Sequence, residues 1–189
     1  EYVITNPRTP WPWINYLGTE DFFSLISNTG GGYTFCKDAR YRRITRYRYN
    51  NVPIDDGGKY FYINDGENIW SPGWKPCKTE LDKYICRHGL NYTVITGAKN
   101  GLEVEILYMV PLHTWAEVQK VTLKNTTNQI KRFKVFSFVE WCLWNAQSDM
   151  ENFQRNLSLG EVEVENSILF HKTEYRDCLL YTSPSPRDA

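Results

Sequence analysis

Residues 92–110 read YTVITGAKNGLEVEILYMV and predict two antiparallel strands joined by a tight turn. The dipeptide Asn100-Gly101 favours a type I′ turn, because both of its central residues take positive φ. The strand that follows alternates apolar and acidic residues, which is the period of a sheet with one buried face. Its apolar face holds Val104, Ile106, Tyr108 and Val110, and its acidic face holds Glu103 and Glu105.

The rest of the chain shows the same pattern of short strands and turns, so we predict an all-β fold, a large antiparallel β-sandwich. We expect the segments 117–124 and 131–143 to pair as a hairpin. Residues 135–139 (VFSFV) are apolar on both faces, which predicts a strand buried between layers. Residues 145–156 are irregular or briefly helical. Further strands are expected at 20–27, 33–37, 59–65, 68–70, 161–165 and 168–170.

Composition excludes several classes of partner. The chain carries 22 basic and 22 acidic residues, so no net charge points to nucleic acid or to an anionic membrane. The basic run 40–48 is interleaved with tyrosines and is more simply a strand with a solvated face. No apolar run approaches the roughly 20 residues that span a bilayer. Aromatic residues make up 15% of the chain, which suits a core and, weakly, sugar stacking.

The cysteines and histidines form no metal motif. The five cysteines are scattered without a Cys-x-x-Cys pair, and His88, His113 and His171 have no zinc-like spacing. The nearest approach is Cys86-Arg-His88. We therefore expect free thiols in a reducing compartment, a cytoplasmic location and no metal.

Paired carboxylates are the candidate catalytic groups, because glycosidases need two of them across the scissile bond. The candidates are Glu140, Asp149 and Glu151, near the irregular stretch. A carboxylate satisfied by a buried partner is the simpler interpretation of each. The glycines at 30–32 indicate a turn rather than a phosphate cradle.

Two segments concentrate groups that suit sugars. Residues 10–16 (PWPWINY) place two tryptophans on a stretch stiffened by proline. Residues 145–149 and 153–156 supply amides and a guanidinium, whose planar donors and acceptors match vicinal hydroxyl groups. The same side chains also anchor loops to backbone carbonyls, and the residues alone leave both interpretations open.

The motifs at 2–7 (YVITNP), 12–18 (PWINYLG) and 31–33 (GGY) resemble the start of the cellobiose and chitobiose phosphorylases, glycoside hydrolase family 94. The resemblance is closer to the cellobiose phosphorylases and covers residues 1–177. It rests on RITRYRYNN (43–51), FVEWCLWNAQ (138–147), QRNLS (154–158) and GEVEVE (160–165).

This resemblance implies an N-terminal β-supersandwich, similar to galactose mutarotase, followed by an (α/α)6 barrel. It implies phosphorolysis of cellobiose to α-glucose 1-phosphate and glucose with inversion, inorganic phosphate being the co-substrate and no cofactor being needed. The general acid would lie in the barrel, so this chain would hold no catalytic residue. The resemblance further implies a homodimer in which Gln154 and Arg155 contact the acceptor glucose of the partner's active site.

Residues 1–177 are therefore expected to form a supersandwich domain that is incomplete at both ends. Residues 178–189 are polar and rich in proline, and they resemble the conceptual translation of a sequencing-library adapter. We expect this stretch to be an artefact without defined structure. The alternative function is a free-standing carbohydrate-binding β-sandwich module without catalytic activity.

Overall fold

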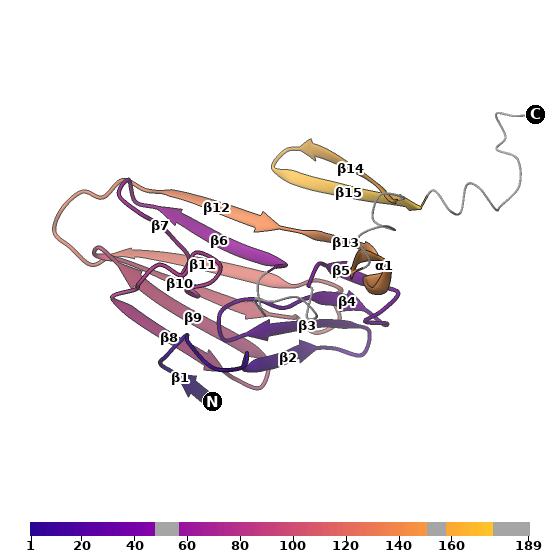
Figure 1. Cartoon of the computed structure of the whole chain (residues 1–189), viewed down its shortest axis with the longest axis horizontal. Coiled ribbons are helices and arrows are strands. Elements are labelled where there is room, and N and C mark those ends of the chain that lie inside the picture. The colour runs from indigo at the N-terminus through magenta and orange to yellow at the C-terminus, as the bar shows by residue number, and fades with distance from the viewer. Residues whose placement is uncertain (48–56, 151–157, 176–189) are drawn as a thin grey trace, which may run out of the picture.

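The computed structural model describes residues 1–47, 57–150 and 158–175, and the described part folds into two layers of antiparallel strands (Figure 1). One layer is sheet A, with the strand order β1-β8-β9-β10-β11. Its strands are β1 (Tyr2–Ile4), β8 (Lys83–His88), β9 (Tyr92–Lys99), β10 (Leu102–Met109) and β11 (Val118–Asn125).

The second layer consists of two sheets placed end to end. Sheet B has the order β13-β5-β4-β3-β2, and sheet C has the order β12-β6-β7. The strands of sheet B are β2 (Ile14–Gly18), β3 (Phe22–Ser27), β4 (Thr34–Cys36), β5 (Arg43–Thr45) and β13 (Trp141–Trp144). Those of sheet C are β6 (Lys59–Asn64), β7 (Ile69–Trp70) and β12 (Lys134–Val139).

Glu140 joins the two halves of this layer, because it is the single residue between β12 and β13. Its N–H donates to Gly58 O at 2.7 Å, and its carbonyl accepts from Arg46 N at 2.9 Å. Beyond β13 the chain forms the short helix α1 (Ala146–Met150). The hairpin of β14 (Ser158–Glu165) and β15 (Ile168–Tyr175) lies beside β13 in Figure 1. The fold class predicted from the sequence is therefore confirmed.

The turn at residues 99–102 forms as its sequence predicts. Asn100 and Gly101 take φ values of 50° and 76°, and β9 and β10 pair in register on either side of them. The apolar face of β10 is buried: Val104 is fully buried, and Ile106 and Tyr108 are each 2% exposed. Burying a large side chain of this kind contributes about 1.5–3 kcal/mol.

One core is shared by the three sheets, so the two layers form a sandwich. Ile95, Val104 and Ile106 enter it from sheet A. Leu17 and Ile26 enter from sheet B, and Ile63 and Trp70 from sheet C. The described residues contain no helix long and apolar enough to cross a membrane.

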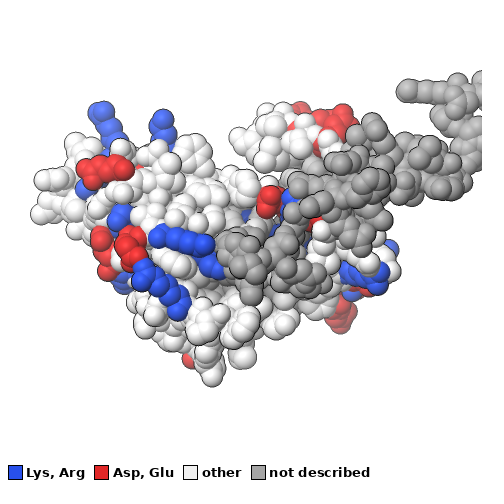
Figure 2. Space-filling model, viewed as in Figure 1, with Lys and Arg blue, Asp and Glu red and all other residues white. Residues whose placement is uncertain are grey.

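Two predictions about the middle of the chain are wrong. Strand β11 pairs with β10, whereas β12 pairs with β6 in the other layer, so residues 117–124 and 131–143 form no hairpin. Strand β12 is also exposed along its whole length; Phe136, for example, is 51% exposed. It is apolar on both faces, yet no described strand pairs with its second edge. In the view of Figure 2, this part of the surface is largely uncharged.

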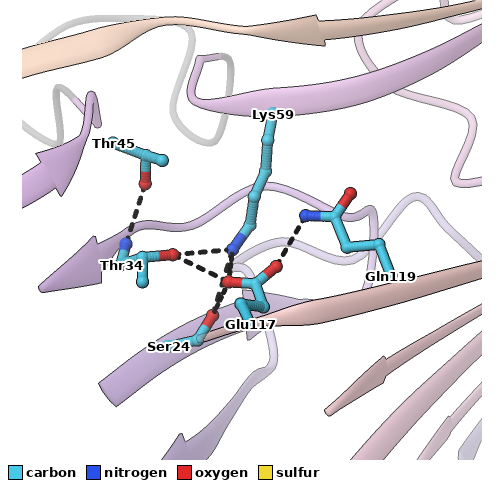
Figure 3. Close-up of polar contacts among 6 residues, drawn as sticks. All are labelled: Ser24, Thr34, Thr45, Lys59, Glu117 and Gln119. Carbon is cyan, nitrogen blue, oxygen red and sulfur yellow. Dashed lines mark hydrogen bonds and ion pairs between the residues drawn. The ribbon is translucent and has the colours of Figure 1, made fainter. Parts of the chain in front are cut away.

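A buried polar network holds the two layers together (Figure 3). The ammonium of Lys59, on β6, forms an ion pair with the carboxylate of Glu117, directly before β11. The two side chains are 2% and 7% exposed. Lys59 Nζ also donates to Ser24 Oγ on β3 and to Thr34 Oγ1 on β4, each at 3.0 Å. The network therefore connects sheets A, B and C.

The network leaves neither charge unsatisfied. Glu117 Oε2 accepts from Ser24 at 2.6 Å and from Thr34 at 2.7 Å, and Gln119 Nε2 donates to Oε1 at 2.6 Å. Burial raises the pKa of the Glu117 carboxyl, but the charge of Lys59 and these hydrogen bonds outweigh it, so the pKa lies below its ordinary value. Burial lowers the pKa of the Lys59 ammonium, and the Glu117 carboxylate opposes that shift.

We expect Glu117→Gln to lower the free energy of unfolding by about 3–5 kcal/mol, because it leaves the buried Lys59 without its counter-charge. The matched control is Glu103→Gln, which removes the partner of Lys83 in a pair whose side chains are 24% and 46% exposed. That pair should contribute less than about 1 kcal/mol. Urea unfolding followed by tryptophan fluorescence measures both, and equal losses in the two variants would contradict a special role for the buried pair.

The stabilisation that Glu117 provides should also depend on pH. A carboxyl whose pKa is depressed in the folded state stabilises the fold above its ordinary pKa and loses that contribution as the pH falls. For Glu117 the ordinary value is 4.5. The difference in unfolding free energy between the unmodified chain and Glu117→Gln should therefore be full at pH 7 and shrink below about pH 4.5. Unfolding at pH 7 and pH 3 tests this, and a difference that stays constant would refute it.

Candidate functional site

The irregular stretch after β13 begins with a capped helix. Asn145 Oδ1 accepts from Gln147 N at 3.1 Å, as an N-cap residue does, and Asp149 N donates to Asn145 O at 3.0 Å. The side-chain oxygen of Gln147 accepts from the guanidinium of Arg40. Both amides thus bond within the protein, which supports the anchoring interpretation of residues 145–149.

Arg46 contacts two acidic residues at this end of the sandwich. Its side chain is 6% exposed, and its Nε donates to Asp149 Oδ2 at 2.9 Å. Its Nη1 lies 3.7 Å from Glu140 Oε1. One guanidinium therefore ties β5 to α1 and to the junction between β12 and β13.

Two of the three candidate acids belong to this cluster. Asp149 is as buried as Arg46, whereas the side chain of Glu140 is 36% exposed. Both carboxylates approach the same guanidinium, which is the geometry of an anchoring ion cluster. Glycosidases instead place two carboxyl groups on opposite sides of a bound sugar. The third candidate, Glu151, lies outside the described residues.

The predicted acceptor contacts, Gln154 and Arg155, also lie outside the described residues. The elements on either side of residues 151–157 are both anchored. Arg46 holds α1 through Asp149, and the ring of His171 on β15 stacks on Trp141 of β13 at 5.0 Å with an interplanar angle of 14°. The structure therefore attaches α1 and the β14–β15 hairpin, the described elements before and after these residues, to sheet B.

The aromatic segment 10–16 leads into and includes the start of β2, the edge strand of sheet B opposite β13. Trp11, Trp13 and Tyr16 are 68%, 46% and 71% exposed. Other aromatic residues, among them Trp70, Tyr84 and Tyr108, are core residues as the composition suggested. The three exposed rings of segment 10–16 remain candidates for sugar contact.

Sequence reasoning missed Arg46, Lys59 and Glu117 as organising residues. Lys59 starts an otherwise apolar strand, and a lone charge in such a place is a signal for a buried partner. Nothing in the sequence identified Glu117 as that partner, because 57 residues separate the two positions and they meet only across the layers.

Comparison with known proteins agrees with the sandwich architecture described above. The family model for the supersandwich domain of glycosyl hydrolase 94 covers residues 1–183. The chain is 41% identical to the N,N'-diacetylchitobiose phosphorylase of Vibrio proteolyticus over 161 residues, which are 83% of this chain and 20% of that protein.

The chain belongs to the supersandwich domain family of glycosyl hydrolase 94. It is also 37% identical to the N,N'-diacetylchitobiose phosphorylase of Vibrio furnissii, covering 93% of this chain and 22% of that protein. With the solabiose phosphorylase of Paenibacillus borealis it shares 36% identity, covering 76% of this chain and 19% of that protein. The chain thus spans about a fifth of the length of these family members.

Asp149→Ala tests the anchoring role of the Arg46 cluster in this supersandwich. We expect a loss of about 3–5 kcal/mol in unfolding free energy, because the substitution leaves a buried guanidinium without its close partner. Glu140→Ala is the matched control, since its carboxylate is farther from Arg46 and more exposed; its loss should be less than half as large. Urea unfolding measures both, and a stable Asp149→Ala variant would argue that Asp149 is kept for chemistry instead.

Proposed function

We propose that the chain is the N-terminal supersandwich of an inverting disaccharide phosphorylase. The observation that carries this proposal is the family match over residues 1–183 together with relatives named as disaccharide phosphorylases. In such a reaction a phosphate oxygen attacks the anomeric carbon while the glycosidic C–O bond breaks. A carboxylic acid gives its proton to the leaving oxygen, so one carboxyl group is enough where an inverting hydrolase needs two.

The charges in the described part support a division of labour. Asp149 is bonded to Arg46, and Glu117 accepts bonds from Lys59, Ser24 and Thr34. Both of these carboxylates hold the fold together. We accordingly assign the general acid and the phosphate pocket to an (α/α)6 barrel that would follow this domain, with inorganic phosphate as co-substrate and no cofactor.

Gln154 and Arg155 are our proposed contribution of this domain to the site. In a homodimer they would hydrogen-bond hydroxyl groups of the acceptor sugar bound in the partner subunit. The anchored elements on both sides of residues 151–157 support this assignment, because binding groups need a rigid attachment to the scaffold.

For the substrate we propose a β-linked disaccharide, and cellobiose is the one that the sequence motifs favour. The two Vibrio relatives are named for N,N'-diacetylchitobiose and the Paenibacillus relative for solabiose. The assay should therefore include all three disaccharides with inorganic phosphate. We expect the enzyme to be cytoplasmic, where phosphate and the sugar phosphate product are retained.

Arg155→Ala in the full-length dimer tests the acceptor site. Losing a hydrogen bond to a charged group costs roughly 1.5–3 kcal/mol, which is about tenfold to a hundredfold in rate or affinity. In the synthetic direction we expect the KM for the acceptor sugar to rise by that factor, with the KM for the sugar 1-phosphate little changed. Arg132→Ala, which removes an exposed arginine elsewhere on the domain, is the control.

Two outcomes would count against these proposals. Normal acceptor kinetics together with a lower melting temperature in Arg155→Ala would make Arg155 a loop anchor. A full-length protein that releases no sugar phosphate from any of the three disaccharides would favour the carbohydrate-binding module instead.

A further inference from the structure

A hollow of about 440 Å³ lies where the segment before β2 meets the loop between β7 and β8. Its charged lining residues are Arg8, Lys75 and Lys78, and none of the lining residues is acidic. Most of the remaining wall consists of the ring of Trp74 and the rings of three prolines, Pro7, Pro10 and Pro12. This volume, with apolar walls and a few charged groups, is typical of sites for small molecules.

The hollow lies at the end of β8 that is remote from the first residue of the chain. Strand β1 runs antiparallel to β8, with Tyr2 paired to His88 and Ile4 paired to Cys86. Beyond β1 the guanidinium of Arg8 forms an ion pair with Glu80, which precedes β8. The lining residues come from the internal segments 7–12, 28–29 and 74–78.

Hydrogen bonds fix the loop that supplies the tryptophan and the two lysines. Trp74 N donates to Ser71 O at 2.9 Å, and Lys78 N donates to Trp74 O at 2.7 Å. Trp74 and Lys78 take φ values of 74° and 57°, a region that residues other than glycine rarely occupy. Gly73 packs so closely on Thr29 that a Cβ would collide with the Thr29 carbonyl. The loop is therefore held in advance of binding, which lowers the entropy cost of any ligand.

The facing wall is held by Asn28, which is fully buried. Its Nδ2 donates to Thr9 Oγ1 at 3.3 Å and to Pro7 O at 3.4 Å. The guanidinium of Arg8 lies 5.5 Å from the centroid of the Trp74 ring, which is a cation–π distance. This contact joins the segment before β2 to the loop between β7 and β8.

The polar side chains of the lining supply hydrogen-bond donors rather than acceptors. Ammonium and guanidinium groups have no acceptor atom. The oxygens of Thr9 and Asn28 already accept, from Asn28 Nδ2 at 3.3 Å and from a main-chain N–H at 3.0 Å. The indole N–H of Trp74 is buried and has no acceptor among the described residues. A ligand rich in acceptor atoms complements such a lining.

The charge of the hollow also selects an anion. Glu80 offsets the charge of Arg8, and it stands outside the lining. Lys75 and Lys78 add two further positive charges. A phosphate monoester carries about two negative charges at pH 7 and only acceptor oxygens.

We propose that this hollow is an accessory binding site for a sugar phosphate, distinct from the acceptor site proposed at Gln154 and Arg155. The phosphate oxygens would accept charge-assisted hydrogen bonds from Lys75 and Lys78. The sugar ring would lie with its apolar C–H face on the indole of Trp74. The volume favours an ester over inorganic phosphate, because a bare ion would fill only part of it.

The site rests on the geometry of this domain, and only the choice of glucose 1-phosphate as the probe rests on the proposed function. Equilibrium dialysis of the full-length protein against radiolabelled glucose 1-phosphate at pH 7 tests it. We expect a second molecule bound per protomer, beyond the one in the catalytic site. Competition with unlabelled inorganic phosphate should show an affinity for that ion at least about tenfold weaker at the second site, the loss expected for one stacked ring.

Lys75→Gln and Lys78→Gln each remove one charge and keep a polar side chain of similar length. Each should weaken binding of the second molecule about tenfold, the loss expected for one charge-assisted hydrogen bond. The matched control is the double variant Lys120→Gln/Lys124→Gln, which removes two exposed lysines of β11 and should bind the second molecule normally.

Each other outcome also decides the matter. The proposal is overturned if no second molecule binds, if the double variant Lys75→Gln/Lys78→Gln still binds it normally, or if inorganic phosphate binds there as tightly as glucose 1-phosphate. If Lys75→Gln melts at a lower temperature, the more exposed Lys78 decides. Binding that depends on the two lysines in a protein without phosphorolytic activity would refute the proposed function and leave this site standing.

Discussion

The ion pair between Lys59 and Glu117 is the constraint on which the arrangement of the two layers depends. Apolar packing alone tolerates exchanges of similar volume and small shifts of one layer over the other. A buried charge tolerates neither, because leaving it without its partner costs several kcal/mol. The Lys59 ammonium has three acceptors, which lie on β3, on β4 and directly before β11. The Glu117 carboxylate accepts hydrogen bonds at both of its oxygens. One placement of sheet A against sheets B and C satisfies all of them.

Buried polar side chains also fix elements at the surface of the sandwich. Arg46 is buried and ties α1 to sheet B, at the start of the segment that carries the proposed acceptor contacts. Asn28 is buried and holds the main chain of Trp13, whose ring is exposed. In each case a buried polar side chain holds a segment at the surface of the domain. A supersandwich built this way offers rigid attachment points for exposed segments at opposite ends of sheet B.

Sequence patterns identified the candidate segments but not the roles of their residues. The sequence predicts a departure from strand structure at residues 145–149, and the structure shows that Asn145 caps a helix there and that Gln147 accepts from Arg40. Glu140 and Asp149 are the sequence's candidates for a catalytic acid, but both carboxylates lie against the guanidinium of Arg46, which is about a hundred residues earlier in the chain. Such partners come from distant strands, so local pattern cannot pair them. The sequence marks the tryptophans of residues 10–16 as unusual, but only the structure shows that both rings are exposed.

The sequence by itself determined the elements of this protein. Alternation of apolar and polar residues set the strands, Asn100-Gly101 set the turn between β9 and β10, and long motifs set the family. These are local properties, carried by backbone preference and by side-chain period. Only the tertiary structure decided which strands pair and which faces are covered. Strand β12 has the composition of a buried strand, but it pairs with β6 and is exposed, since burial depends on what packs against a strand and not on the strand's own residues.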